Sequence, residues 1–194
     1  MSVMADESGS HPRQHGRPLT VRDLESMPDD GNRYELIDGE LYVSAAPATR
    51  HQKIVYRLHD VLDAVCPHHL EVIGAPYAVQ LSFNTEVQPD LLVAPIEDFT
   101  DKKLPAPPLL AVEVLSPSTS VVDLNKKKRL YERFGVPNYW VIDPIEPNLT
   151  VFELDDGGRY HLVAEVNGDK PFEAVQPFPA RIVLTELLGR FANR

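Results

Sequence analysis

Hydrophobic residues recur at two different spacings along the chain, and the spacing separates helical from extended segments. In residues 49–65 they return every three or four positions, which predicts one amphipathic helix. Residues 118–134 predict a second helix, because the Ser-Pro-Ser-Thr stretch before it offers caps and an early proline. Gly135 is well placed to end that helix. A short helix from the N-cap Thr20 through Met27 and a terminal helix in LTELLGRF complete the helical prediction.

Short runs rich in apolar and β-branched residues predict strands. RYELIDGELYVS predicts a hairpin that turns at Asp38 and Gly39, the strongest short hairpin signal in the chain. Other strands are predicted in LEVIGAP, YAVQLSF, QPDLLVAP, LLAVEVLS, NYWVIDP, LTVFEL and RYHLVAEV. The segment IEDFTDKKLPAPP, with its prolines and charges, predicts a loop. This order of elements predicts an α/β (α+β) fold, in which a mixed β-sheet is flanked by helices.

The composition is that of a soluble globular protein, with 43% hydrophobic and 25% charged residues among 194. Residues 1–17 lack periodic apolar positions, so we expect a disordered arm with solvated His11 and His15, followed by a single domain over residues 18–194. Cys66 is the sole cysteine, which excludes an intrachain disulfide and favours a core thiol. No apolar stretch approaches the roughly 18 residues that cross a bilayer, and the start lacks a secretion signal. We therefore expect a cytoplasmic protein that is not bound to a membrane.

The net charge of −10 limits the ways in which this chain could bind nucleic acid. Broad electrostatic adhesion depends on lysines and arginines that neutralise phosphates, and here acidic residues outnumber basic ones by 29 to 19. A nucleic-acid role would therefore rest on a local basic patch or on metal ions.

Two acids interrupt consecutive apolar runs. Glu113 lies inside LLAVEVL, where an ionised carboxylate is costly unless it meets a cation, and Asp90 precedes Leu-Leu-Val in the run before it. If these strands are neighbours, both acids can point to the same side, because side chains alternate along a strand. Two such acids repel unless a divalent ion lies between them, and oxygen ligands without cysteine favour Mg²⁺ or Mn²⁺.

The helix that follows supplies positive charge at a defined angle. Asp123, Lys127 and Tyr131 are four residues apart, so they form a row along one flank. At about 100° per residue, Lys127 falls inside the apolar arc of the helix, whereas Lys126 and Lys128 fall outside it. Lys127 is thus predicted to face the sheet and to pair with Asp90 or Glu113.

These motifs together are similar to a known family. QPD through EVLSPST, then D-x-x-x-K-x-x-x-Y and GVPNYWVIDP, resemble the Uma-two family, a branch of the PD-(D/E)xK nuclease superfamily. The likeness includes RYELIDGELY and the helix that opens with His51, and it covers about residues 20–190. The resemblance implies a restriction-endonuclease-like fold and a metal-dependent endonuclease that hydrolyses phosphodiester bonds of nucleic acid. The pattern fits DNA and RNA alike, and DNA is the expected substrate.

The resemblance also implies roles for individual residues. Asp90 matches the aspartate of the PD motif and Glu113 the acid of the second motif, so both would bind Mg²⁺ or Mn²⁺, with the backbone carbonyl of Val114 as a further ligand. The superfamily's simplest pattern has lysine two residues after the glutamate, where this chain has Leu115. In the Uma-two branch the lysine lies on the following helix, which fits Lys127.

Lys127 would then orient the attacking water or neutralise the developing oxyanion. Tyr131 would fix the lysine, and Glu35 would contribute a further acid from an N-terminal element. His51, at the start of its helix, suits a neutral hydrogen-bonding role as well as a structural one. Cutting both strands of a duplex would favour a homodimer.

Several plainer interpretations compete with this one. Asp90 could simply end a strand, Glu35 could be a surface residue, and Glu113 with Lys127 could be a structural ion pair. The lysine run could be a solvated helix face, while Tyr139 and Trp140 fit a core better than a base-stacking surface. Two other functions stay open. One is a catalytically inactive protein of the same fold that binds nucleic acid or a protein partner, and the other is a two-carboxylate glycosidase, which leaves Lys127 without a task.

Overall fold

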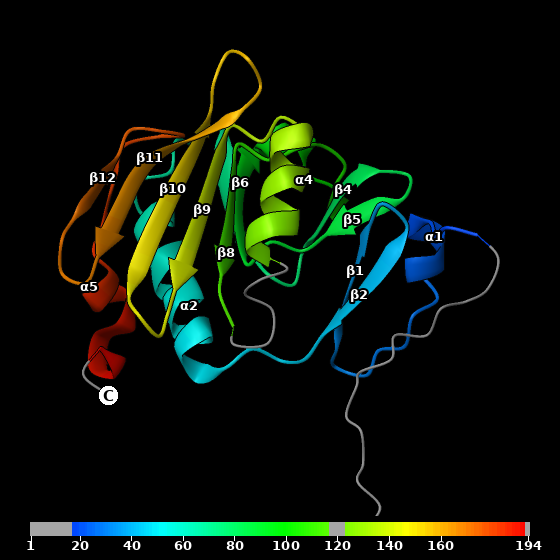
Figure 1. Ribbon diagram of the computed structural model, residues 1–194, viewed down its shortest axis with the longest axis horizontal. Helices are drawn as coiled ribbons and strands as arrows, with labels where there is room; N and C mark the ends of the chain where they lie inside the picture. The colour runs from blue at the N-terminus through cyan, green and yellow to red at the C-terminus, as the bar shows by residue number, and fades with distance from the viewer. Residues whose placement is uncertain (1–16, 117–122, 193–194) are drawn as a thin grey trace, which may run out of the picture.

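A computed structural model describes residues 17–116 and 123–192 (Figure 1). The predicted arm therefore lies outside the described residues except for Arg17, and so do residues 118–122 of the second predicted helix. The helical segments are α1 (Val21–Leu24), α2 (Thr49–Asp63), η1 (Ile96–Asp98), η2 (Asp123–Lys127), α4 (Lys128–Arg133), α5 (Leu184–Leu188) and η3 (Gly189–Phe191).

The strands form two mixed sheets and one small ribbon. The central sheet has the order β11-β10-β9-β8-β6-β3, and only its β8–β9 pair is parallel. Its strands are β3 (Leu70–Gly74), β6 (Leu91–Pro95), β8 (Leu110–Val114), β9 (Asn138–Asp143), β10 (Asn148–Leu154) and β11 (Tyr160–Asn167). The second sheet, β2-β1-β5-β4-β7, is made of β1 (Arg33–Ile37), β2 (Glu40–Ser44), β4 (Ala78–Ser82), β5 (Thr85–Val87) and β7 (Lys103–Leu104). β12 (Phe172–Ala174) and β13 (Ala180–Ile182) form the ribbon.

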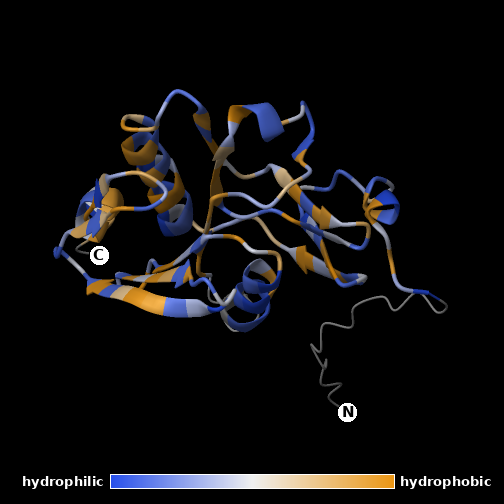
Figure 2. Ribbon diagram, turned by 90° about the horizontal axis from the view of Figure 1, so that it is seen from above, coloured by the Kyte–Doolittle hydropathy of each residue, from blue (hydrophilic) through white to orange (hydrophobic). Residues whose placement is uncertain are grey.

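The central sheet is covered on both faces. One face packs against α2, α5 and β13 through a core that includes Leu58, Val112, Trp140 and Leu187. The other face packs against α4 and the second sheet through a separate core, and Figure 1 shows α4 between the central sheet and the strands β4 and β5. In Figure 2 hydrophobic and hydrophilic residues lie on different sides of the longer helices, as burial of one face requires. The predicted mixed sheet flanked by helices is confirmed.

The hairpin forms at the predicted turn. Asp38 and Gly39 both have positive φ, at 53° and 82°, which is the backbone geometry of the tight turn that Asp-Gly favours. The Asp38 amide donates to Thr85 Oγ1, and the Gly39 amide donates to the carbonyl of Asn84. These bonds tie the turn to β5, so the hairpin is held at the edge of the second sheet.

The predicted helices form, with three differences at their ends. α2 agrees closely with the periodic segment, whereas α1 ends at Leu24 rather than Met27. The second helix enters through the π-helical turn η2 before α4 begins, and it ends as predicted at Gly135, whose φ is 73°. The terminal helix is a short α5 continued by η3.

Some short elements carry no signal in the sequence. β5, β12 and β13 have three residues each, too few for a periodic pattern, and they exist because partner strands satisfy their backbone groups. The segment predicted as a loop contains η1 and β7, and β7 pairs with β4 in parallel. Within the described ranges, no helix has the length and apolar character needed to cross a bilayer.

Candidate active site

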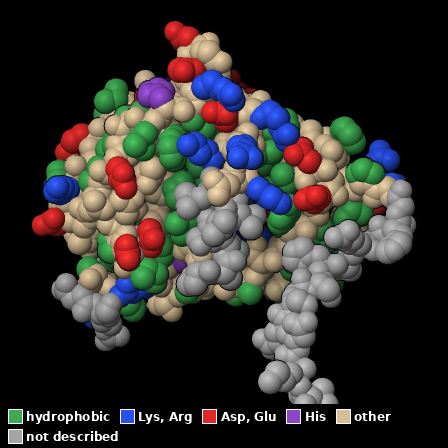
Figure 3. Space-filling view, viewed as in Figure 1, with side chains coloured by type: hydrophobic (Ala, Val, Ile, Leu, Met, Phe, Trp, Pro, Cys, Tyr) green, Lys and Arg blue, Asp and Glu red, His purple; other side chains and the backbone are tan. Residues whose placement is uncertain are grey.

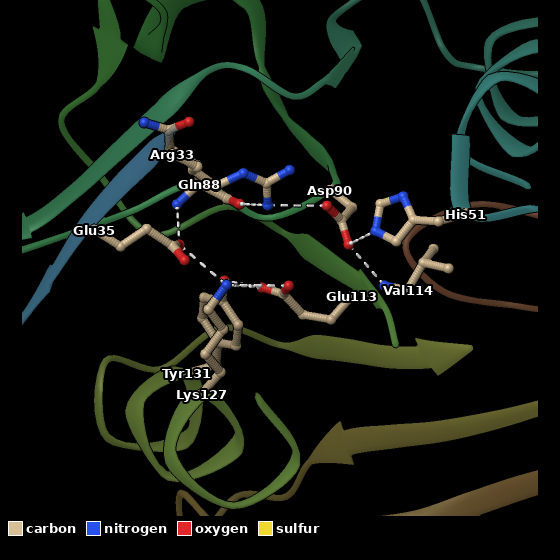
Figure 4. Close-up of polar contacts among 9 residues, drawn as sticks. All are labelled: Arg33, Glu35, His51, Gln88, Asp90, Glu113, Val114, Lys127 and Tyr131. Atoms are coloured by element: carbon tan, nitrogen blue, oxygen red, sulfur yellow. Dashed lines mark hydrogen bonds and ion pairs between the residues drawn. The ribbon is translucent and has the colours of Figure 1, made fainter. Parts of the chain in front are cut away.

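Strand pairing brings the two acids of the apolar runs together. β6 and β8 are antiparallel neighbours with Leu91 opposite Val112, and one further step of this register places Asp90 opposite Glu113. Leu92 and Ala111, the next residues on the same face of each strand, belong to the core beneath α4 and the second sheet. Both residues therefore lie on the side of the central sheet that faces this helix, and both are 2% exposed. Figure 4 shows Glu113 directed toward Lys127 and Asp90 held between Arg33 and His51.

Helix α4 and the turn before it supply the partners of Glu113. Lys127 Nζ lies 3.0 Å from Glu113 Oε1 and 3.1 Å from Oε2, and the Tyr131 hydroxyl donates to Oε1 over 2.8 Å. Lys127 is 3% exposed, while Lys126 is exposed and Lys128 lies over the ring of Phe152. The predicted inward orientation of Lys127 is confirmed, and the four-residue step to Tyr131 puts both groups on one carboxylate.

The second sheet contributes a third carboxylate. Glu35, on β1, places Oε1 3.0 Å from Lys127 Nζ and accepts a hydrogen bond of 2.6 Å from the Gln88 amide. Glu35 is buried rather than on the surface. The Lys127 ammonium thus lies between Glu35 of one sheet and Glu113 of the other, an arrangement that offsets the cost of burying it.

Asp90 is held by three donors of its own. Arg33 Nη1 lies 3.0 Å from Oδ1, while His51 Nε2 at 3.0 Å and the Val114 amide at 2.8 Å share Oδ2. Burial acts to raise the pKa of Asp90, but His51, Arg33 and Lys127 outweigh it and hold the pKa of this carboxyl below its usual value. Asp90 therefore stays ionised at neutral pH.

His51 and Tyr131, which approach these carboxylates from helices, have defined donor roles. An ionised Asp90 can only accept, so His51 carries a proton on Nε2, and its buried Nδ1 has no hydrogen-bond partner in the described part of the chain. Burial, together with the charges of Glu113 and Glu35, holds the pKa of Tyr131 well above its usual value. The Tyr131 hydroxyl is consequently a permanent donor to Glu113.

These groups surround a small cavity of about 160 Å³, which is lined by Arg33, Glu35, Ser44, Ala45, Ala46, Pro47, Ala48, His51, Asp90, Glu113, Val114, Ser116 and Lys127. A larger cavity of about 560 Å³ lies next to it and shares Arg33, His51 and Asp90 with it. Three acids, Glu35, Asp90 and Glu113, line the small cavity against two permanently basic residue types, Arg33 and Lys127.

The donor set of the small cavity fits a hard divalent cation. Its anionic ligands are carboxylate oxygens, which Mg²⁺ and Mn²⁺ prefer, and Cys66 is not among the lining residues. Among the described residues, no three His, Cys, Asp or Glu side chains form a ready-made metal cage. Mg²⁺ does not need one, because it is commonly held by one or two carboxylates with water and substrate oxygens completing its shell. Asp90, Glu113 and the carbonyl of Val114 are the ligands predicted from the sequence, and all three residues line this cavity.

A family model described as "Putative restriction endonuclease", the Uma2 family, matches residues 21–186. The chain belongs to the Uma2 family. This confirms the resemblance drawn from EVLSPST and the lysine-tyrosine helix. Among solved structures, a protein from Anabaena variabilis titled a "putative nuclease belonging to DUF820" has a TM-score of 0.68 and 19% identity. That match covers 90% of this chain and 99% of the other, and it shows a shared fold. No curated protein matches this chain.

The structure of this Uma2 protein brings all the predicted side chains together and adds two residues that the sequence did not single out, one through its side chain and one through its backbone. Arg33 binds Asp90, and the Gln88 backbone binds Glu35. Arg33 lies two residues before Glu35 on β1, so both side chains share a strand face, and that spacing was the available signal. Tyr139 and Trp140 are core residues, as predicted, and Cys66 packs half-buried at the edge of the main core.

Proposed function

We propose that this Uma2 protein is a metal-dependent endonuclease that hydrolyses phosphodiester bonds of nucleic acid, with DNA as the substrate. The observation that carries the proposal is the position of Lys127, which lies within 3.1 Å of Glu113 beside the carboxylate of Asp90 on the neighbouring strand. A structural ion pair needs only one acid and one base. Here a buried lysine and three buried acids line one cavity, and such a concentration of ionisable groups is typical of a catalytic site.

In this proposal Asp90, Glu113 and the Val114 carbonyl hold Mg²⁺ or Mn²⁺. The bound ion would lower the pKa of a water molecule and stabilise charge on the scissile phosphate. Lys127 orients the attacking water or neutralises the developing oxyanion, and Tyr131 fixes Glu113 so that the ammonium keeps its place. Glu35 supplies a second anchor for the lysine.

Arg33 and His51 border both cavities, so we assign them to the substrate. The Arg33 side chain is 21% exposed and can reach a phosphate oxygen while one of its nitrogens keeps Asp90 ionised. The larger cavity gives room for the nucleotide beside the scissile phosphate.

One observation favours the alternative, a catalytically inactive protein of the same fold that binds nucleic acid or a protein partner. Both oxygens of Asp90 already accept hydrogen bonds from Arg33, His51 and Val114. A metal ion would have to share Asp90 with these donors. In the inactive case the ion pairs would serve only to join the two sheets.

The test is cleavage of supercoiled plasmid, single-stranded DNA and RNA with Mg²⁺, Mn²⁺ or EDTA. We expect cleavage of DNA that requires the metal and falls at least about 100-fold in Asp90→Asn, Glu113→Gln and Lys127→Met. Lys102→Met, at an exposed lysine outside the cavity, is the matched control and should cleave like the wild type.

Two results would contradict the proposal. If no substrate is cut and calorimetry detects no binding of Mn²⁺ by the wild type, the inactive alternative replaces it. If cleavage persists at equal rates in all three site variants, the activity comes from a different site or from a contaminant.

We also propose that the protein acts as a homodimer and that it works in the cytoplasm.

A further inference from the structure

Exposed basic residues gather on η2, which ends at Lys127, and on α4, which follows it directly. Residues 126–133 contain five lysines and arginines and one acid, and three of the basic residues, Lys126, Arg129 and Arg133, are exposed, although the chain as a whole has a net charge of −10. Figure 3 shows blue side chains gathered over α4, with red side chains mostly to either side. The single acid of the segment, Glu132, turns toward β11 and accepts the Tyr160 amide. This face is therefore the local basic patch that an acidic protein would need to meet an anionic partner.

A groove of about 360 Å³ runs between this helix and the β1–β2 hairpin. It is lined by Ile37, Asp38, Glu40, Tyr42, Lys126, Arg129, Leu130 and Arg133, which we call the α4 groove. Tyr42 lies two residues before Ser44 on β2, and Ser44 lines the cavity of the candidate active site. Lys126 precedes Lys127 directly. The α4 groove and the cavity of the candidate active site are thus built on the same strand, β2, and the same helical turn, η2.

The basic residues of the groove are available to an external anion. Arg129 is exposed and has no hydrogen bond or ion pair within residues 17–116 and 123–192. Lys126 pairs with Glu40 at 3.6 Å, and Arg133 pairs with Asp38 at 2.7 Å. All four side chains are about half exposed or more. Exposed ion pairs of this kind contribute about 0–1 kcal/mol, so a phosphate group can take the place of either carboxylate.

We propose that the α4 groove binds the sugar-phosphate backbone of a nucleic-acid duplex on its way into the active site. This inference rests on the proposed function and names the surface that it uses. Arg129 and Arg133 are four residues apart on α4, which is about 6 Å along the axis. Phosphates of one strand follow one another about every 3.4 Å along the duplex axis, so arginines this far apart can each meet a different phosphate of one strand. The groove offers cationic donors suited to phosphate oxygens, and it predicts binding that does not depend on sequence.

The experiment measures the anisotropy of a fluorescein-labelled 20-base-pair DNA duplex, with EDTA present so that binding is observed without cleavage. Arg129→Gln is compared with Arg57→Gln, an exposed arginine on α2 that likewise has no ion pair in the described chain. Each lost phosphate contact should reduce the salt slope of log K by about 0.9 and weaken binding roughly fivefold at 0.15 M salt. The triple variant Lys126→Gln, Arg129→Gln, Arg133→Gln should bind roughly 100-fold more weakly.

Arg57→Gln should keep the wild-type affinity and slope. Equal binding by Arg129→Gln and Arg57→Gln would overturn the inference, and so would a triple variant that loses affinity with an unchanged salt slope. Binding of polyglutamate in place of duplex would assign the groove to an acidic protein and overturn it as well. If the pattern of binding holds while no metal gives cleavage, the inference stands and the proposed catalysis fails.

Discussion

Removing the Lys127 ammonium should lower the stability of the whole domain. Its partners, Glu35 and Glu113, come from different sheets, and without it two buried carboxylates would face each other. We expect Lys127→Met to lower the free energy of unfolding by about 3 kcal/mol, because breaking one side of a buried ion pair costs more than replacing the whole group. Urea denaturation measures this difference.

Two further variants decide whether the loss arises from charge. Lys126→Met, at the exposed neighbour, should change stability by less than about 0.5 kcal/mol. Adding Glu35→Gln and Glu113→Gln to Lys127→Met should recover most of the loss, because no charge is then left unpaired. A Lys127→Met protein as stable as the wild type would show that the ammonium does not hold the sheets together.

Asp90 should give a signature in the pH dependence of stability. Its folded-state pKa lies below the ordinary value of 3.8, because His51, Arg33 and Lys127 outweigh burial. A carboxyl whose pKa is depressed on folding adds stability above its unfolded pKa and loses it as the pH falls toward the folded one. We expect Asp90→Asn to be less stable than the wild type by about 1–3 kcal/mol at pH 7, with the gap closing below about pH 4.

Urea titrations from pH 7 to pH 3 test this, with Asp63→Asn as the exposed control. The control should run parallel to the wild type. A gap for Asp90→Asn that stays constant over the whole range would mean that charge at this position contributes nothing.

At the scale of elements, two glycines with a left-handed backbone conformation form the turn of the β1–β2 hairpin and the end of the α4 helix. Gly39 and Gly135 have φ values of 82° and 73°, a conformation that costs other residues about 1–2 kcal/mol. A methyl group at Gly135 would meet nothing within 4 Å, whereas at Gly39 it would come within 2.7 Å of the Pro18 Cβ. Gly135→Ala should therefore cost about 1 kcal/mol, and Gly39→Ala should cost about 2 kcal/mol or more.

Thermal and urea unfolding of the two variants provide the comparison. Gly74→Ala is a suitable reference, because that glycine lacks a positive φ and its added methyl would make ordinary contacts at 3.7 Å. Equal losses at Gly39 and Gly135 would indicate that Pro18 moves aside without resistance.

The sequence was most informative where local geometry decides the outcome. The inward orientation of Lys127 follows from helical phase, and the alternation of strand side chains puts Asp90 and Glu113 on one side of the sheet once their strands are neighbours, a pairing that only the structure supplies. The π-helical turn η2 does not disturb this phase, because Lys127 is its last residue and the step to Tyr131 is α-helical. Both steps need only a few neighbouring residues.

Contacts between distant segments were harder to predict. Arg33 and Asp90 are 57 residues apart, and nothing in RYELI says which acid its arginine will meet. Glu35 was as compatible with a surface position as with the buried one it occupies, because its burial depends on how the second sheet packs over α4. Strands of two or three residues, such as β7 and β12, depend in the same way on partners remote in sequence.

At the scale of the whole molecule, the proposed homodimer has a kinetic consequence. The described part of each chain carries one cavity of the active-site kind, so one chain can cut only one strand at a time. A dimer with two sites should convert supercoiled plasmid to linear DNA with little nicked intermediate. Wild type mixed with an excess of Glu113→Gln should instead give nicked circles, because mixed dimers hold one working site.

Gel analysis of the time course and sedimentation velocity measure these two properties. Sedimentation at the mass of one chain, together with full accumulation of nicked circles before linear DNA, would rule out the dimer.

The position of Lys127 between Glu35 and Glu113 also constrains which substitutions related sequences can accept. A relative that replaced the residue equivalent to Lys127 by an apolar one would leave two buried carboxylates without the cation between them, and a second substitution would be needed to regain the lost stability. Loss of the lysine should therefore be accompanied by loss of Glu35 or Glu113 in the same sequence. An alignment in which the three positions vary together would record this dependence.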